Sequence, residues 1–448
     1  MIMNLVVLSL MLPSRLLSWV KTTLPKRKSE NNAVHSDRID YNTDKIKPNL
    51  GVHQDGYSYV YMASGSTPEQ NMKKTIELLG GIEKIISEND IVLLKPNAQW
   101  WNQGMTNTDA MKAFMQMVLD IPGFGGEIIV ADNHQYKEPN SRAWTTQHRN
   151  GMFNYNELIE YFNKQGFNNV TKYHWRCAGP NPNPLQGDAS SGRRVTGPED
   201  GDGYVWRDDI VYKAPNDHIC WMTYPVFTST YSGITIDFKN GPWKNGTYLK
   251  DRKLKFINFS ALNHHGPYSG VTASVKNLMG VVDMTCGFQG TEPEGTYNVH
   301  YVGVSNMIRY KKRIHWRFRF LRSLLDKAAY KDFHYTGSAL GKFMASIRIP
   351  DLNIITAEWV GWGSRTDVSK SVYPRTILAS RDPVAIDYVA ARDILLEVTP
   401  NTQRKYRQLN DPTLETGPFN KFLISCNNEK IGNLDPTKIK TLQIHSNK

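Results

Sequence analysis

The sequence is poor in cysteine. Its 448 residues contain four, Cys177, Cys220, Cys286 and Cys426, and none has another within four positions. A ferredoxin-type iron–sulfur cluster needs several closely spaced thiolates, and a structural zinc knuckle needs CxxC pairs. The chain therefore has no iron–sulfur motif, and an iron–sulfur-associated redox accessory role is disfavoured. Buried free thiols fit these cysteines best, with disulfides in an oxidising compartment as the alternative.

The sequence also lacks the short signatures of several enzyme classes. It has no G-x-G-x-x-G after an expected strand, no G-x-x-x-x-G-K-[ST], no H-E-x-x-H and no G-x-S-x-G. The first two cradle phosphates on glycine-rich loops, the third binds zinc on one helix face, and the fourth presents a nucleophilic serine. Dinucleotide-dependent enzymes, P-loop NTPases, zinc peptidases of this type and serine hydrolases are therefore disfavoured.

Positive charge is in excess, with 54 Lys and Arg against 42 Asp and Glu and a formal net charge of +12. This balance favours anionic partners such as phosphates, carboxylates or lipid headgroups. Much of the excess lies in Lys21–Lys28 and Arg309–Arg322, and no RNA- or DNA-binding motif accompanies it, so nucleic acid is disfavoured. The second run suits a helix that faces a membrane or an anion, or a solvated helix face. The charge pattern does not define an oligomeric state.

The first 28 residues form an apolar segment with a basic flank. Met1–Leu12 is almost wholly apolar, Arg15 interrupts it, and Lys21–Lys28 follows. A secretory signal needs positive charge before the apolar run and a small-residue cleavage site after it, and both are missing. We expect residues 1–28 to attach to a membrane surface, with a cleaved signal or a frayed terminus as alternatives. Membrane-associated, exported and cytoplasmic locations all stay open.

The rest of the chain alternates between strand and helix patterns, which predicts an α/β fold with a mostly parallel sheet flanked by helices. Residues 1–50 form the N-terminal segment and a linker, residues 51–400 a single large α/β domain, and residues 401–448 a C-terminal extension. Residues 178–250, rich in Gly, Pro and Asn, predict an irregular insertion with short antiparallel pieces. Thr67 and Asp382 are expected to cap helices, and Thr106 or Thr108 a third. Strands are expected over Tyr57–Ala63, Ile91–Leu94, Glu127–Ala131, Asn169–Tyr173, Leu254–Phe259, Leu352–Ile355, Arg375–Ala379 and Thr441–His445.

Polar residues follow five of these strands. They are Lys95-Pro96-Asn97, Asp132-Asn133-His134, Asn263-His264-His265, Thr356 with Glu358 and the Gly361-Trp362-Gly363 turn, and Ser380-Arg381-Asp382. In open parallel sheets, ligands bind beyond the carboxyl ends of the strands. We therefore expect these side chains to converge at one edge of the sheet.

The residue types suggest roles at that edge. Lys95 and Lys276 stand in apolar contexts, where a half-buried lysine needs an anion or a shifted pKa, so both are candidate anion ligands. The alternative is an internal salt bridge to Asp132, Asp382 or Asp387. Asp132, His265 and Lys276 are the candidate catalytic residues, because they can exchange protons. Asp132, His134 and His265 are also candidate ligands of a divalent metal, with a turn aspartate and structural histidines as the alternatives.

Four stretches share one recognisable pattern: Val92–Asn97 with Thr106-Asn107 behind it, Ile129–Asp132, Gly270–Gly280 and Ala379–Asp387. Together they resemble the domain-of-unknown-function family 362, and the resemblance spans about residues 75–395. It implies an α/β domain with polar motifs at strand ends. The motif positions are Lys95, Asn97, Asp132, His265, Lys276, Asn277, Asp382 and Asp387.

The chain departs from the family pattern at Asn263, where a lysine is frequent, and at Thr356, where an aspartate is frequent. The resemblance implies no established reaction. The residues and the resemblance together predict an enzyme that acts on a small anionic ligand, a phosphate or carboxylate. Asn97, Asn277, Asp382 and Asp387 complete its binding site, and a divalent metal is an optional cofactor. The alternative is a non-catalytic ligand-binding or membrane-attached accessory protein.

Overall fold

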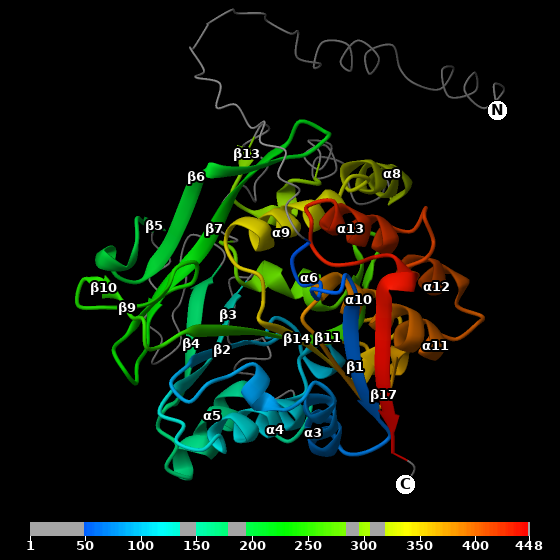
Figure 1. Ribbon diagram of the computed structural model, residues 1–448. Helices are drawn as coiled ribbons and strands as arrows, with labels where there is room; N and C mark the ends of the chain where they lie inside the picture. The colour runs from blue at the N-terminus through cyan, green and yellow to red at the C-terminus, as the bar shows by residue number, and fades with distance from the viewer. Residues whose placement is uncertain (1–48, 135–148, 178–193, 284–294, 305–318, 447–448) are drawn as a thin grey trace, which may run out of the picture. The chain divides into compact units, whose positions relative to one another are not determined.

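The structure is a computed structural model that describes residues 49–134, 149–177, 194–283, 295–304 and 319–446 (Figure 1). All of these residues belong to one unit, Lys47–Lys448. The expected membrane segment, residues 1–28, lies outside them, as do Cys286 and residues 305–318 of the basic run. No helix in the described ranges is long and apolar enough to cross a membrane. Cys220 and Cys426 are buried free thiols, as expected.

A ten-stranded sheet forms the centre of the unit, in the order β17-β1-β16-β14-β11-β2-β3-β4 with β12 on β11 and β15 on β14. Neighbouring strands are parallel from β14 through β4, and β1 is parallel to β17. The prediction of an α/β fold with a mostly parallel sheet is confirmed. The strands are β1 Ser58–Ser64, β2 Ile91–Lys95, β3 Glu127–His134, β4 Val170–Cys177, β11 Leu254–Gly266, β12 Gly270–Thr272, β14 Leu352–Gly361, β15 Ser371–Val372, β16 Thr376–Ser380 and β17 Ile439–His445.

Strand β16 runs against its two neighbours. It pairs antiparallel with β14, where Asn353 lies opposite Ser380, and antiparallel with β1, where Ser64 lies opposite Thr376. The carboxyl end of β16 therefore lies at the edge where the parallel strands begin. The prediction that all five polar strand ends share one edge was wrong for Ser380-Arg381-Asp382.

Helices cover both faces of this sheet. On one face lie α3, α4 and α5, and on the other lie α6, α9, α10 and α13 (Figure 1). The described helices are α3 Pro68–Leu78, α4 Thr108–Leu119, α5 Tyr155–Lys164, α6 Ser274–Asn277, α8 Arg319–Ala329, α9 Tyr335–Ser346, α10 Pro383–Ala390, α11 Leu396–Val398, α12 Arg404–Asn410 and α13 Pro418–Asn427, with a π-helical turn at Ala391–Leu395.

Alternating side chains of the strands divide the apolar interior into two cores. In β2, Val92 and Leu94 join the core under α3, α4 and α5, whereas Ile91 and Leu93 join the core on the other face. Lys95, the next residue of the second set, points to the face that carries α6. Because side chains alternate along β2, the lysine at the carboxyl end of this buried strand points into the interior.

Residues 194–250 are more regular than their composition predicts. They form most of a second sheet of seven strands, in the order β10-β9-β8-β7-β6-β5 with β13 on β7. The long β6 and β7 pair antiparallel, and alternate residues of β7, including Met222 and Val226, are buried in the main apolar core. The strands are β5 Arg194–Val195, β6 Gly203–Lys213, β7 Ile219–Thr228, β8 Thr235–Asp237, β9 Gly241–Lys244, β10 Thr247–Tyr248 and β13 Gly295–Thr296.

Two helix caps and the C-terminal strand follow the sequence closely. The side chain of Thr67 accepts the N–H of Gln70 at the start of α3, and that of Asp382 accepts two N–H groups at the start of α10. The cap of α4 is Asn107, which lies between the two expected threonines. Residues 401–448 are integrated with the rest, because β17 pairs with the whole of β1 and α13 packs on α9.

Candidate functional site

Helix α6 lies at the centre of the candidate site. It has four residues, Ser274–Asn277, and the 3-10 turn Leu278–Gly280 continues it. Asp387 of α10 holds its first turn, because the two carboxylate oxygens accept the N–H groups of Ser274 (2.7 Å) and Val275 (2.9 Å). Such a carboxylate satisfies backbone donors that have no partner inside the helix. Lys276 and Asn277 follow on α6, and each joins a different group of side chains.

Lys95, Asp132, Asn258, Asn277 and Asn353 form the first group, which we call the central polar cluster. The amine of Lys95 lies 3.1 Å from Oδ1 of Asp132 and donates to Oδ1 of Asn277 (2.7 Å) and to the carbonyl of Pro96 (2.8 Å). These three acceptors match the three donors of an ammonium group. Lys95 is 2% exposed and Asp132 4%, so solvent screens their attraction weakly.

Burial acts on both members of this ion pair. It lowers the pKa of Lys95 and raises the pKa of Asp132, because leaving water disfavours each charge, and the attraction between the two groups opposes both shifts. Asp132 also accepts the N–H groups of Ala98 (2.9 Å) and Asn133 (2.8 Å). The salt-bridge alternative for Lys95 is thus the arrangement in the structure, and it ties β2 and β3 to α6.

Asn277 connects this pair to the middle of the sheet. Its Nδ2 donates to Oδ1 of Asn258 (2.9 Å), and Nδ2 of Asn258 donates in turn to Oδ1 of Asn353 (3.0 Å). The hydroxyl of Ser274 donates to the same oxygen of Asn353 (2.7 Å). These residues come from β11, β14 and α6, so the central polar cluster fixes the helix against the parallel strands.

Gly280 lets the turn after α6 approach the ion pair. A Cβ on this residue would lie 2.1 Å from Oδ1 of Asp132 and 2.4 Å from the amine of Lys95. Both distances are far inside van der Waals contact, and the neighbours are held by several hydrogen bonds. A glycine is therefore required here by close packing.

Lys276, His265, His300 and Arg365 form the second group, which we call the cationic cluster. Lys276 is 6% exposed; its amine lies 3.0 Å from the sulfur of Met279 and 5.8 Å from the ring centre of Phe333. No carboxylate of the described ranges lies within ion-pair distance of this amine. Burial, and then the charge of Arg365, lower the pKa of Lys276 to about 7.

His265 and Arg365 are in direct contact. Nδ1 of His265 lies 2.6 Å from the hydroxyl of Thr272 and 2.9 Å from Nη1 of Arg365. The guanidinium also stacks on Trp100, 4.3 Å from the ring centre. Burial, followed by the charges of Lys276 and Arg365, holds the pKa of His265 well below its usual range, so the imidazole is neutral at neutral pH.

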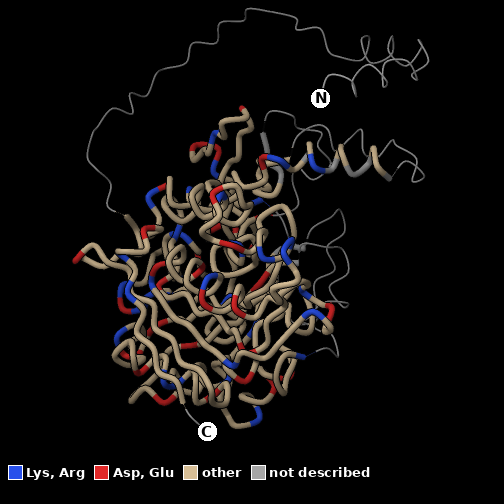
Figure 2. The backbone as a smooth tube through the Cα atoms, turned by 90° about the vertical axis from the view of Figure 1, so that its right-hand side faces the viewer, with Lys and Arg blue, Asp and Glu red and all other residues tan. Residues whose placement is uncertain are grey.

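His300 completes the cationic cluster. Burial and the charge of Lys276 hold its pKa well below the usual range, and its ring centre lies 6.2 Å from that of Phe333. Elsewhere, acidic and basic residues are interspersed along the described backbone (Figure 2). Here Arg365, His265 and His300 surround Lys276, and each of these groups makes a positive charge on its neighbours less favourable. A bound anion would relieve that repulsion.

The structure brings together some of the predicted site residues. Lys95, Asp132 and Asn277 meet in the central polar cluster, and His265 meets Lys276 in the cationic cluster. Asp387 contacts the site through the backbone of α6. Asn97 is 7% exposed and its Nδ2 has no hydrogen-bond partner within the described ranges, while its N–H donates to the hydroxyl of Thr106 (2.8 Å).

Other predicted residues lie apart from these. Asp382 is at the opposite edge of the sheet, where it caps α10 and accepts the N–H of Asn433 (2.7 Å) and the hydroxyl of Ser58 (2.5 Å). The side chain of His134 lies outside the described residues. Asp132 and His265, the other two expected metal ligands, belong to different clusters. Among the described residues, no group of three or more His, Cys, Asp or Glu side chains is placed to hold a metal ion.

Sequence reasoning missed Arg365 and His300. Arg365 follows the Gly361-Trp362-Gly363 turn at the end of β14, and that turn was a usable signal. His300 lies in no recognisable pattern.

The two departures from the family pattern, Asn263 and Thr356, have structural roles. Asn263 donates to the carbonyl of Gln103 (2.8 Å), and the hydroxyl of Thr356 accepts the N–H of Asn107 (3.1 Å).

The sequence model described as "Domain of unknown function (DUF362)" matches residues 251–392. Residues 251–392 are therefore similar to the DUF362 family. The expected resemblance is confirmed over this stretch, which is narrower than residues 75–395. The DUF362 match contains the whole cationic cluster, α6 and Asp387, whereas Lys95 and Asp132 precede it. No curated protein and no solved structure matches the chain.

Proposed function

We propose that this protein is an enzyme that acts on a small anionic ligand, a carboxylate or a phosphate, bound at the cationic cluster. One observation carries the proposal: the amine of Lys276 is buried (6% exposed) and has no carboxylate partner in the described ranges. Its neighbours are Arg365 and two imidazoles. Burying a charge without a counter-charge is costly. A bound anion would supply that counter-charge.

Each member of the cationic cluster has a distinct role in this proposal. Arg365 stays charged at all physiological pH values and offers planar donors to carboxylate or phosphate oxygens. Lys276, with a pKa of about 7, exchanges a proton near neutral pH, as a general acid or base must. His265 is neutral and can take part in a proton transfer beside them.

The central polar cluster has a positioning role in the same proposal. Asn277 is held by Lys95 and Asn258, and it follows Lys276 on a helix of only four residues. Any shift of the Lys95–Asp132 pair would therefore move Lys276. Asn97, whose Nδ2 has no hydrogen-bond partner among the described residues, is assigned to orient the ligand.

Sulfate is the probe for the anion site, because its charge does not change between pH 6 and pH 9. Its affinity is measured by isothermal titration calorimetry on the full chain and on Lys276→Met. We expect saturable binding to the wild type and a loss of at least about tenfold in Lys276→Met, since a charge-assisted contact disappears. Lys421→Met, which removes an exposed charge on α13, is the matched control and should bind as the wild type does.

The pH dependence tests Lys276 more specifically. Above pH 7 the amine is mostly neutral, so sulfate binding must be accompanied by proton uptake. The affinity should then fall by up to about tenfold per pH unit between pH 7 and pH 9. Sulfate affinity that is independent of pH, or unchanged in Lys276→Met, would contradict the anion assignment.

Catalysis is tested by a thermal-shift screen of carboxylated and phosphorylated metabolites followed by mass spectrometry of each stabilising compound. Conversion by the wild type but not by Lys276→Met supports the enzyme. A compound that stabilises the protein and is recovered unchanged after long incubation favours the non-catalytic binding protein instead.

A further inference from the structure

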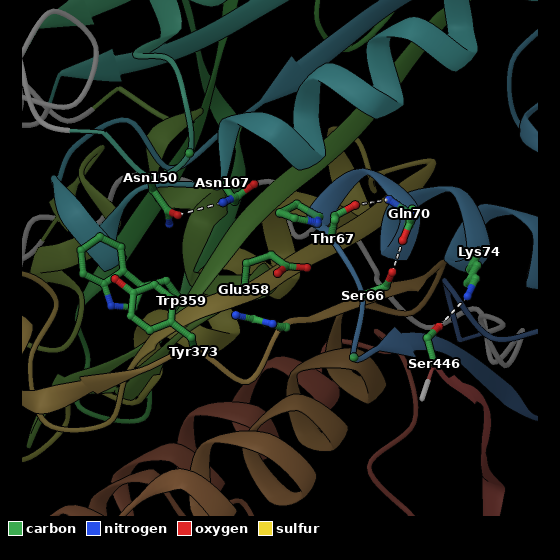
Figure 3. Close-up of a pocket in the computed structure, with 14 residues that line it drawn as sticks. Ser66, Thr67, Gln70, Lys74, Asn107, Asn150, Glu358, Trp359, Tyr373 and Ser446 are labelled. Carbon is green, nitrogen blue, oxygen red and sulfur yellow. Dashed lines mark hydrogen bonds between the residues drawn. The ribbon is translucent and has the colours of Figure 1, made fainter. Parts of the chain in front are cut away.

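A cavity opens at the carboxyl edge of the sheet, on the face that carries α3 and α4 (Figure 3). Its volume is about 830 Å³, which is enough for a ligand of nucleotide size. The loop before α3, the N-terminus of α4, β14 and the segment between β15 and β16 line it. The cationic cluster surrounds α6, on the other face of the sheet, so this cavity is a separate place in the molecule.

Glu358 of β14 forms the polar centre of the cavity. It is 4% exposed, and Figure 3 shows its carboxylate among the lining residues. Oε1 accepts a hydrogen bond from Nδ2 of Asn71 (3.1 Å), and within the described chain Oε2 accepts none. The pKa of Glu358 is raised to about 7, chiefly by burial; Asn71 and Arg375 oppose this shift, and the charges of Glu69 and Asp109 add to it. A buried carboxylate with a free oxygen favours a ligand that donates hydrogen bonds.

An aromatic pair forms one wall. The rings of Trp359 and Tyr373 are stacked, with centres 5.2 Å apart and planes inclined by 12° (Figure 3). The indole N–H of Trp359 donates to the hydroxyl of Ser371 (2.8 Å), which holds the pair in place. Tyr373 is 63% exposed, so a flat ring face is available to a planar group.

Positive charge lines the same cavity. Arg375 adopts a left-handed backbone (φ 51°), which is uncommon outside glycine. Nδ2 of Asn71 donates to the carbonyl of Arg375 (2.9 Å) and stabilises this conformation. Lys74 lies one turn after Asn71 on α3, and its amine donates to the hydroxyl of Ser446. The N-terminus of α3 also faces the cavity through Thr67 and Pro68, and its dipole favours an anion.

We propose that this cavity binds a phosphorylated sugar, free or as part of a nucleotide. Vicinal sugar hydroxyls would donate to Glu358, as ribose hydroxyls do to acidic residues in other α/β proteins. The phosphate would lie near Lys74, Arg375 and the start of α3. A nucleobase, where present, stacks on the Trp359–Tyr373 pair. Binding in this cavity does not depend on the function proposed for the cationic cluster.

The test uses adenosine 5′-monophosphate, ribose 5-phosphate and inorganic phosphate as probes in calorimetric titrations of the full chain. We expect the wild type to bind the first two more tightly than inorganic phosphate. Glu358→Gln should weaken both by about tenfold or more, and Lys74→Met by about tenfold, because each loses a charge-assisted hydrogen bond. The matched controls on α3 are Glu77→Gln and Lys73→Met, whose side chains are exposed and which should bind as the wild type does.

The remaining outcomes separate the two sources of the ligand and the two sites. Tighter binding of the nucleotide than of ribose 5-phosphate identifies a nucleotide site, and equal binding identifies a sugar phosphate site. Because the cationic cluster is itself proposed to take a phosphate, the titrations are repeated in Lys276→Met, in which the affinities of adenosine 5′-monophosphate and ribose 5-phosphate for this cavity should be unchanged. The proposal is overturned if neither probe binds, if inorganic phosphate binds as tightly as ribose 5-phosphate, if Glu358→Gln and Lys74→Met both bind normally, or if Lys276→Met abolishes binding.

Discussion

Two lysines with similar sequence contexts have different environments. Lys95 meets Asp132, so its charge is balanced inside the protein, whereas Lys276 has no carboxylate partner in the described ranges. Lys276 and Asn277 are neighbours, yet successive residues of a helix point about 100° apart, so one faces the cationic cluster and the other the central polar cluster. Both lysines were identifiable from the apolar residues on either side of them in the sequence. Those neighbours do not reveal whether a carboxylate from another strand lies within reach of the amine.

Replacement of Lys276 by methionine should stabilise the free protein. The unfolded chain keeps this amine near its ordinary pKa of 10.5 and the folded chain near 7, so the unfolded state binds the extra proton between these values. Wild-type stability therefore rises with pH in that window, and the cost of the buried amine is fully present below pH 7. Lys276→Met should gain about 2–5 kcal/mol at pH 6.5.

The measurement is urea denaturation of both proteins at pH 6.5, 8 and 9.5 in a buffer without multivalent anions. The difference between the two proteins should shrink steadily as the pH rises. A Lys276→Met protein that is less stable than the wild type at pH 6.5 would show that the amine has a counter-charge, and the anion site would lose its basis.

Gly280 should not tolerate a methyl group. A Cβ would lie 2.1 Å from Asp132 and 2.4 Å from Lys95, so Gly280→Ala must displace a buried ion pair. We expect a loss of about 2–4 kcal/mol in the free energy of unfolding, measured by urea denaturation. Gly197→Ala is the control, because no atom lies within 4 Å of its Cβ position and its backbone is extended. Equal effects of the two substitutions would mean that the turn after α6 packs differently.

At the scale of elements, α6 depends on a residue far away in the sequence. Asp387 accepts two backbone N–H groups of α6, and burial raises its pKa to about 8 while these donors lower it. Asp387→Asn keeps the shape but turns an amide N–H₂ toward one of the donors. We expect a loss of about 1–3 kcal/mol in stability, and weaker sulfate binding because Lys276 moves with α6. A stable variant with normal sulfate affinity would show that α6 does not need this contact.

The strands themselves were predictable, because continuous apolar runs such as Ile91–Leu94 read as strands buried on both faces. The direction of β16 was predicted wrongly from the same kind of run. A parallel connection needs a crossover of about a dozen residues or more, usually a helix. The segment from Trp362 to Arg375 has no helical apolar period, and this absence pointed to an antiparallel return. The second sheet was missed because its long hairpin has many polar residues on its exposed side.

At the scale of the whole molecule, the site residues meet from distant parts of the chain. Lys95 and Asn277 are 182 positions apart, and the contact of Arg365 with His265 spans 100. The rule that ligands bind at the carboxyl ends of parallel strands correctly predicted the meeting of Lys95 and Asp132. It gave no means of seeing that one edge of the sheet carries two proposed ligand sites, one on each face.

These two places should behave independently. Glu358 points to the face of α3, and Lys276 lies on α6 on the other face, with no shared hydrogen-bond partner in the described chain. Distant substitutions without a common partner usually add within about 0.3–0.5 kcal/mol. The stability change of the double variant Lys276→Met with Glu358→Gln should therefore equal the sum of the two single changes within that range.

Coupling between the two sites would also have a structural basis, because β14 carries Glu358 and leads directly into the turn that holds Arg365. If β14 transmits a shift, the double variant should depart from additivity by about 1 kcal/mol or more. Urea denaturation of the four proteins measures this coupling. Titration of sulfate with and without saturating ribose 5-phosphate measures it a second time, through binding. Because coupling between two ligands is reciprocal, a change in sulfate affinity must be matched by an equal change for the sugar phosphate.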